Sequence, residues 1–300
     1  MIDVVVLHAL FGTSLPISKY LLQFSPPFFL AGIRMFVAGL LLLVFNYFRK
    51  KQFSDINRSH IFDYVQVIVI GIYLKYMLRY WALDFLTASK MSFLFNSGPF
   101  IAALFSYFAF NERLTIKQWA GLFIGFVGFI PILITSSTAE QSFGEFMYIS
   151  WPELAVFLAV MAHCYGMIVS RKIIRKHGHS ASLANGVRMF GGGLLALITS
   201  YFVEQSEAVT HIGTFIGWLG LLILISNIIC HNFYLKLLKR YTVTFLSFAD
   251  FLSPLFVAFY GWLFLHEAIT WHYFASAAIV FSGLYLFYQD ELKNVHISAH

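Results

Sequence analysis

Residues 31–43, AGIRMFVAGLLLL, form an apolar stretch that carries a single charged side chain, Arg34. A closely similar stretch, NGVRMFGGGLLAL, occupies residues 185–197 and places Arg188 at the corresponding position. A charge inside such a segment is rare, because burying it in an apolar medium costs free energy. The shared arginine therefore indicates that the chain contains two copies of one unit.

The composition is typical of an integral membrane protein. Of the 300 residues, 59% are hydrophobic and only 11% are charged, and the mean hydropathy is +0.76. Soluble domains contain about 25% charged residues, so a soluble class is excluded. The net charge of +6 is explained by basic connections on one side of a membrane. We therefore expect a lipid bilayer, and not nucleic acid, as the surrounding partner.

Ten apolar segments follow one another along the chain with short connections. They cover residues 2–22, 27–48, 62–81, 85–110, 116–135, 151–173, 181–203, 212–235, 242–265 and 271–289. A helix of roughly 20 residues crosses the hydrocarbon core of a bilayer. The sequence therefore predicts an all-α membrane protein with ten transmembrane helices.

Lys and Arg are concentrated in alternate connections and in the C-terminal tail. Connections that contain neither residue include 23–26, 136–150, 204–211 and 266–270. Because basic residues favour the cytoplasmic side, we expect both termini in the cytoplasm. The two halves then cross the membrane in opposite directions. We expect a first five-helix repeat at 1–137, a second, inverted repeat at 151–290 and a short cytoplasmic tail at 291–300.

Further motifs resemble a known family, and some of them recur in the second half. They are Phe11-Gly12 followed by Lys19, the arginines already named, and Pro99 with Glu112-Arg-Leu-Thr115, Gly121 and Gly128, repeated as Pro254 with Glu267-Ala-Ile-Thr270 and Gly283. Over nearly its whole length the chain resembles the EamA-type ten-helix carriers of the drug/metabolite transporter superfamily, although that family commonly has Trp at the position of Phe11. The resemblance implies a secondary transporter in a bacterial-type inner membrane, without a cofactor.

Basic residues inside predicted spans are candidates for contact with a substrate. Lys75 and Arg79 lie four residues apart on one helix face, and Lys90 lies in the next segment. Long basic side chains also reach outward to the membrane interface, an alternative that fits Arg79 better than the deeper Lys75.

Arg34 and Arg188 are interpreted as structural charges that bond to backbone carbonyls freed near Pro99 or Pro254. The alternative is an anchor for a substrate carboxylate or phosphate. We favour the structural role, since both copies keep the arginine although a substrate needs only one anchor.

Asp250 is the only acidic residue well inside a predicted span. It could pair with Arg188, carry a proton, or balance a cationic group of the substrate. We favour the substrate counter-charge, because the segments of Pro99 and Pro254 are expected to border the cavity.

Other polar and aromatic side chains complete the predicted site. Asn96 precedes Gly98-Pro99, a dipeptide that can break a helix and free backbone groups to line a cavity. The other polar candidates are His163 and Asn227. The aromatic candidates for the cavity walls are Tyr76, Tyr80, Phe93, Phe95 and Phe248.

Transport of a small organic metabolite by alternating access is the predicted function. The mixed charges and many rings suit a zwitterionic, amino-acid-like substrate. Carriers of S-adenosylmethionine and S-adenosylhomocysteine, which occur in the resembled superfamily, are the specific alternative. An enzyme is not expected, since His266-Glu267 begins a zinc motif that Thr270 fails to complete, and no metal is expected.

Overall fold

The computed structural model describes residues 2–48, 58–110, 114–135, 145–146, 149–175, 180–204, 209–230 and 250–295, together with residues 233 and 237. This part of the chain is helical except for two short strands, β1 (Glu145–Phe146) and β2 (Ile149–Ser150), which pair antiparallel. The expectation of an all-α membrane protein is confirmed. Phe248 and Glu112 lie outside the described residues.

The described part of each predicted apolar segment contains helix. In the first half they are α1 (Ile2–Gly12), α2 (Ser14–Leu21), α3 (Pro27–Phe48), α4 (Arg58–Gln66), the π-helix η1 (Val67–Leu74), α5 (Lys75–Phe85), α6 (Ala88–Phe95), α7 (Gly98–Phe110), α8 (Ile116–Val127) and α9 (Ile130–Leu133). In the second half they are α11 (Trp151–Arg175), α12 (Ala181–Val203), α13 (Ile212–Leu222), the π-helix η2 (Ile223–Cys230), α16 (Leu252–Leu265) and α17 (Trp271–Val295).

Six helical stretches within the described residues are long and apolar enough to cross a membrane. They are Ile2–Leu21, Pro27–Phe48, His60–Phe85, Ile116–Leu133, Trp151–Ser170 and Ser182–Val203. Two shorter apolar helices cover Ile212–Asn227 and Leu252–Leu265. The count of ten spans stays a prediction.

Prolines explain why three predicted segments are broken into two helices. A proline ring clashes with the carbonyl four residues earlier and lacks the N–H that would bond to it. Pro16, Pro99 and Pro131 lie four residues after the last residues of α1, α6 and α8, respectively. The predicted break before Gly98-Pro99 is therefore present, and the first segment, expected as one helix, is interrupted at Thr13.

The chain divides into two compact units, and each takes segments from both halves of the sequence. Unit 1 comprises Met1–Tyr20, Phe85–Phe157 and Leu224–His300, and unit 2 comprises Leu21–Asp84 and Leu158–Ile223. The division of the sequence into repeats at 1–137 and 151–290 stays a prediction.

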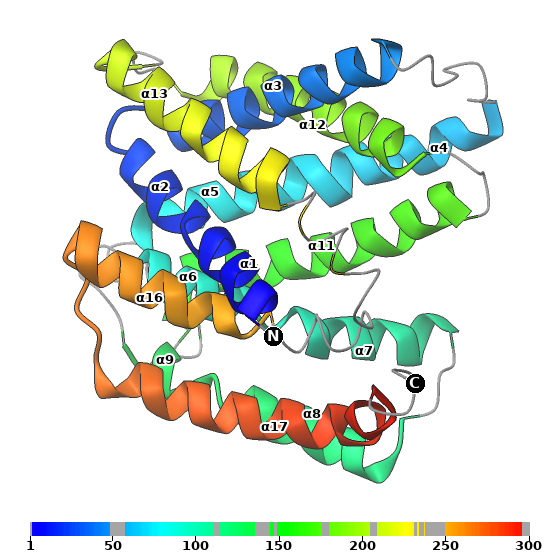
Figure 1. Ribbon diagram of the computed structural model, residues 1–300, viewed down its shortest axis with the longest axis vertical. Coiled ribbons are helices and arrows are strands. Elements are labelled where there is room, and N and C mark those ends of the chain that lie inside the picture. The colour runs from blue at the N-terminus through cyan, green and yellow to red at the C-terminus, as the bar shows by residue number, and fades with distance from the viewer. Residues whose placement is uncertain are drawn as a thin grey trace. The chain divides into compact units, whose positions relative to one another are not determined.

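Unit 2 is built on the packing of α3 against α12 (Figure 1). The contacts are reciprocal and antiparallel: Gly32 meets Leu197 while Gly186 meets Leu43. At the centre a side chain at Gly39 would overlap the backbone of Phe190, and one at Gly193 would overlap the backbone of Phe36. The small residues thus let the two backbones approach closely. Helices in a membrane depend on such close packing, because the hydrophobic effect does not drive them together in lipid. The rings of Phe36 and Phe190 lie 4.9 Å apart between centroids.

The carboxylate of Glu204 caps the start of α3 in unit 2. Glu204 accepts hydrogen bonds from the backbone N–H groups of Phe28 at 2.7 Å and Phe29 at 2.9 Å. The first N–H groups of a helix have no partner within the helix, and they attract negative charge. This cap joins the start of α3 to the residue that follows α12.

Unit 1 contains two helix pairs. The packing of α8 against α17 brings Gly121 and Gly283 into backbone contact (Figure 1), and α1 packs on α16 through Gly12 and Phe256. Glu267, which follows α16, accepts hydrogen bonds from Ala88 N at 2.6 Å and Ser89 N at 3.2 Å. Glu267 therefore caps the start of α6.

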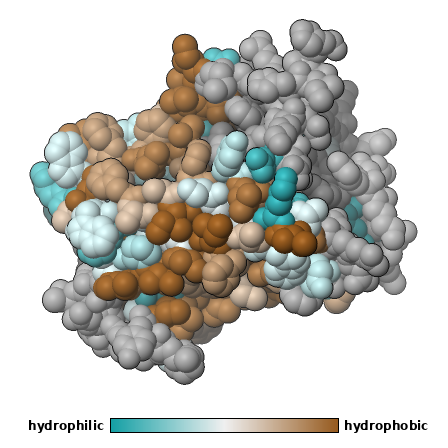
Figure 2. Space-filling view, turned by 90° about the horizontal axis from the view of Figure 1, so that it is seen from below, coloured by the Kyte–Doolittle hydropathy of each residue, from teal (hydrophilic) through white to brown (hydrophobic). Residues whose placement is uncertain are grey.

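The surface of the helices is strongly apolar. Figure 2 shows apolar side chains over much of the face that it draws. On α3 and α12, Phe48 is 78% exposed and Phe202 is 75% exposed. Such exposure would be unfavourable in water and is expected where helices meet lipid.

Candidate functional site

Basic side chains from three helices gather inside unit 2. Arg34 lies on α3, Lys75 and Arg79 lie on α5, and Arg188 lies on α12. We call these four residues the cationic cluster. Lys75 and Arg34 are buried, with 7% and 4% of their surface exposed. The charge of Lys75 interacts electrostatically with those of Arg79 and Arg188, and that of Arg79 interacts with Arg34.

The position of Lys75 follows from a change of helix type. The π-helix η1 ends at Leu74, and α5 begins with Lys75. A π-segment adds backbone to a turn and rotates the residues after it, which is why such segments often occur at functional sites. Gly71 within η1 lets its backbone touch Gly166 of α11, so unit 2 is tightly packed beside Lys75.

Tyrosines line the cationic cluster. The Nζ of Lys75 lies 4.1 Å from the centroid of the Tyr76 ring, within the range of a cation–π interaction. Arg34 donates a hydrogen bond of 2.7 Å to the hydroxyl of Tyr80, and the rings of Tyr76 and Tyr80 are 6.2 Å apart. Tyr80 was expected only as a neighbour in the cavity wall, and the structure makes it the partner of Arg34.

Arg188 is held by polar side chains. It donates hydrogen bonds of 2.8 Å from Nε to Asn185 Oδ1 and of 2.8 Å from Nη1 to Ser170 Oγ. The expected partners were backbone carbonyls near Pro254, and the structure shows side chains of α11 and α12 instead. Whether Arg34 and Arg188 serve only structure stays a prediction.

His163 of α11 belongs to the same neighbourhood. It interacts electrostatically with Lys75, Arg79 and Arg188. Unit 2 thus brings together six of the predicted residues, which are Arg34, Lys75, Tyr76, Arg79, His163 and Arg188. Within the described residues, no acidic side chain forms an ion pair with Lys75 or Arg188. An anionic group, such as a carboxylate, would offset this positive charge in a medium of low dielectric constant.

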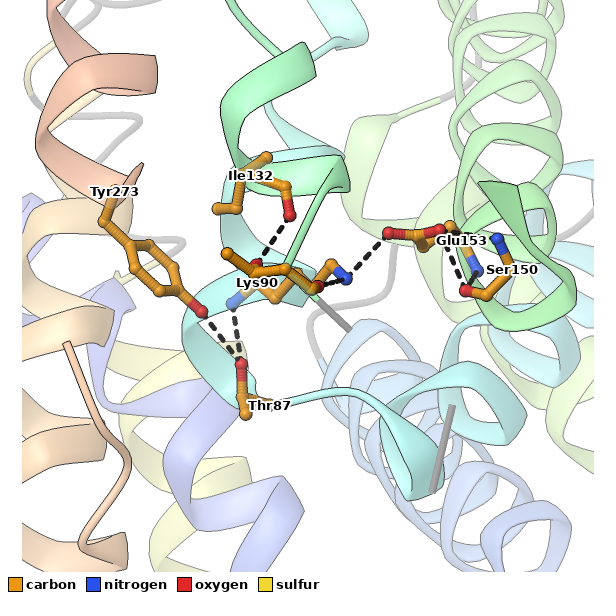
Figure 3. Close-up of polar contacts among 7 residues, drawn as sticks. Thr87, Lys90, Ile132, Ser150, Glu153 and Tyr273 are labelled. Atoms are coloured by element: carbon orange, nitrogen blue, oxygen red, sulfur yellow. Dashed lines mark hydrogen bonds and ion pairs between the residues drawn. The ribbon is translucent and has the colours of Figure 1, made fainter. Parts of the chain in front are cut away.

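Lys90 of unit 1 has a different environment (Figure 3). Its Nζ lies 2.7 Å from Glu153 Oε1, and both side chains are 2% exposed. The ammonium also donates to the backbone oxygen of Thr135. Thr87 caps α6 by accepting a 3.1 Å hydrogen bond from Lys90 N, and its hydroxyl is 3.1 Å from that of Tyr273. Lys90 stays a predicted site residue, although Glu153 already balances its charge.

Phe93 and Asn96 lie at the end of α6 in unit 1. Phe93 is 5% exposed, and its ring meets that of Phe129 at 5.5 Å. Asn96 ends the helix, and its Nδ2 donates a 2.8 Å hydrogen bond to Ser92 O. The amide therefore adds a second hydrogen bond to the Ser92 carbonyl, which also accepts the backbone N–H of Asn96 at 3.2 Å.

Asp250 precedes α16 in unit 1 and lies next to a histidine. Its Oδ1 is 3.5 Å from Nδ1 of His8, and 46% of the Asp250 side chain is exposed. Asn227, also in this unit, is half-buried on η2. The contact with His8 was not anticipated.

His8 and Glu153 are the residues that sequence reasoning missed. His8 is a polar residue within the first apolar segment, and Glu153 is an acidic residue at the start of the sixth. Both signals are visible in the sequence. Their partners, however, lie far away along the chain.

Comparisons with known proteins agree on a transporter. The profile of the EamA-like transporter family matches residues 2–134 and 150–289. A protein of Chlamydia muridarum (strain MoPn / Nigg), named an S-adenosylmethionine/S-adenosylhomocysteine transporter, is 30% identical over 291 residues, which is 96% of this chain and 91% of the relative. A protein of the same name from Chlamydia trachomatis serovar L2 is also 30% identical, and the match covers 96% of this chain and 88% of that relative. A solved crystal structure with 16% identity has a similar fold, with a TM-score of 0.64 over 95% of each chain.

Proposed function

The chain belongs to the EamA-like transporter family, and on that basis we propose that it carries S-adenosylmethionine across the membrane in exchange for S-adenosylhomocysteine. Membership of this family makes the protein a multi-pass membrane transporter and not an enzyme. The observation that carries the proposal is the 30% identity to the chlamydial transporters over 96% of this chain.

The chemistry of the cationic cluster supports this substrate. Both compounds contain an amino-acid carboxylate and an adenine ring. Lys75 and Arg188 have no acidic partner among the described residues, so a substrate carboxylate would supply the missing negative charge. The half-buried ring of Tyr76 beside Lys75 offers a face on which a purine can stack.

The names of the chlamydial relatives favour the S-adenosyl alternative over the general zwitterionic, amino-acid-like substrate that the sequence suggested. S-adenosylmethionine is itself such a molecule, with a nucleoside attached through sulfur. The relatives favour the nucleoside-bearing compounds over a simple amino acid.

The proposed architecture is ten spans in two inverted five-helix repeats, with both termini in the cytoplasm and the protein in an inner membrane. The reciprocal packing of α3 and α12 supports it. Gly32 contacts Leu197, and the corresponding residue Gly186 contacts Leu43. Such repeats favour alternating access, in which a site near the midplane opens to one side at a time.

Exchange in proteoliposomes tests the proposed function. Vesicles loaded with S-adenosylhomocysteine should accumulate labelled S-adenosylmethionine faster than empty vesicles, and unlabelled S-adenosylhomocysteine outside should compete. Methionine and adenosine, each offering half of the substrate, should compete weakly. Uptake that ignores the internal compound and is blocked by simple amino acids would refute the proposal and favour a general amino-acid carrier.

A further inference from the structure

A buried histidine and an accessible carboxylate meet in unit 1. His8 of α1 has 0% of its surface exposed. Its Nδ1 lies 3.2 Å from Ser253 Oγ and 3.5 Å from Asp250 Oδ1. Its Nε2 is also buried and has no hydrogen-bond partner among the described residues. His8, Asp250 and Ser253 therefore form a small polar cluster between α1 and the start of α16.

The geometry favours one form of the imidazole. A neutral histidine carries a single N–H, and a proton on Nδ1 can be donated to Ser253 or Asp250. A proton on Nε2 would instead be a buried donor without an acceptor among the described residues, which is unfavourable. Nε2 is then a buried lone pair able to accept a further proton. Proton uptake would place an imidazolium beside the carboxylate.

The described residues around His8 include few charges. Among the described elements, α16 packs against α1, and Cys230 and Leu237 form an apolar cluster with Val4 and Leu7 of α1. In the described parts of these elements, the other titratable side chains are Asp3 of α1, Cys230 of η2 and Tyr260 of α16. Asp250 is the only acidic residue described in contact with His8. Its side chain, 46% exposed, gives a proton a route to the pair.

We propose that His8 and Asp250 together hold one exchangeable proton, and that this proton balances the charge of the transported compound. The inference rests on the proposed function. S-adenosylmethionine has a sulfonium that S-adenosylhomocysteine lacks, so the two differ by one positive charge near neutral pH. A bound sulfonium and a bound proton repel each other in a medium of low dielectric constant, even without contact.

The exchange then balances in charge as well as in substrate. S-adenosylmethionine crosses in one direction with the pair unprotonated. S-adenosylhomocysteine crosses in the other direction with one proton on the pair. No bond of either substrate is made or broken, and no net charge crosses the membrane in a full cycle.

Calorimetric titration in buffers of different ionisation enthalpy tests this inference, because it counts the protons that accompany binding. The purified full-length protein is titrated with each compound between pH 5.5 and 8.5. Binding of S-adenosylhomocysteine should take up about one proton more than binding of S-adenosylmethionine within a window of pH. His8→Gln should still bind S-adenosylhomocysteine but lose the difference in proton uptake, and Asp250→Asn should lose this difference as well. Asp3→Asn, a carboxylate change on the same helix, should keep it.

The possible failures are distinguishable. If the wild-type protein binds both compounds with equal proton uptake, the inference is wrong while the proposed function stands. A difference that persists in both variants would place the proton elsewhere and overturn the assignment. Binding of neither compound would overturn the proposed function. If the variants do not fold, the wild-type measurement still decides whether a charge-balancing proton exists.

Discussion

Removing Lys90 should destabilise the protein by leaving Glu153 as a buried charge. The two groups are 2.7 Å apart, and each side chain is 2% exposed. With an effective dielectric constant of about 20, their attraction at 2.7 Å is about 6 kcal/mol before desolvation is subtracted. Breaking a buried pair by removing one partner typically costs about 3–5 kcal/mol. We expect Lys90→Met to lower the free energy of unfolding by an amount in this range.

A double-mutant cycle separates the ion pair from other effects of the substitution. Glu153 also accepts hydrogen bonds from Ser150 N at 2.6 Å and Ser150 Oγ at 2.9 Å, which Glu153→Gln keeps in part. The double variant Lys90→Met/Glu153→Gln should therefore be more stable than Lys90→Met alone. Denaturant-induced unfolding in detergent micelles, followed by tryptophan fluorescence or circular dichroism, measures all four free energies.

A more exposed pair provides the matched control. Lys172 lies 2.8 Å from Asp63, and 48% of the Lys172 side chain is exposed, whereas only 5% of the Asp63 side chain is. Lys172→Met should therefore cost less than Lys90→Met, because solvent around Lys172 already weakens the attraction in this pair. Equal losses in Lys90→Met and Lys172→Met, or additive effects in the cycle, would show that burial of the Lys90–Glu153 pair does not determine its contribution.

The remaining predictions concern the cationic cluster, the helix crossing and the topology. Lys75→Met should weaken binding of both S-adenosyl compounds equally, by about 10-fold or more, because the carboxylate that they share loses a charged partner. Unchanged affinities in titration calorimetry would show that Lys75 is not part of the site. Arg188→Ala should lower stability by about 1–3 kcal/mol by orphaning polar partners, and a variant that is stable but binds nothing would make Arg188 a substrate anchor. Gly39→Leu should cost at least about 1–3 kcal/mol, since the side chain overlaps the backbone of α12, and wild-type thermal stability would contradict the close crossing. A fluorescent-protein fusion after residue 300 should fluoresce, whereas an active alkaline-phosphatase fusion there would overturn the inverted topology.

The proposed proton makes the exchange insensitive to the membrane potential. Exchange of the two S-adenosyl compounds in proteoliposomes should not respond to a membrane potential set with potassium and valinomycin. In Asp250→Asn an inside-negative potential should accelerate uptake of S-adenosylmethionine, since the compensating proton is lost. A wild-type exchange driven by the potential would contradict charge balance.

The sequence alone determined the features that depend on neighbouring residues. Long apolar segments predict spanning helices, and the repeat of Arg34 as Arg188 predicts the duplication. Helix breaks are equally local, because a proline acts on the carbonyl four residues before it. The ends of α6 and α8 can therefore be read from Pro99 and Pro131.

Only the tertiary structure decided which distant side chains meet. His8 and Ser253 are 245 residues apart in sequence, and Arg34 and Tyr80 are 46 apart. No helical periodicity relates such positions, so the sequence left three roles open for Asp250, with a substrate counter-charge favoured, and gave Lys90 no partner. The structure instead shows Asp250 beside His8 and Lys90 beside Glu153. Apolar helices offer many packing arrangements of similar free energy, and close contacts at glycines such as Gly39 select among them.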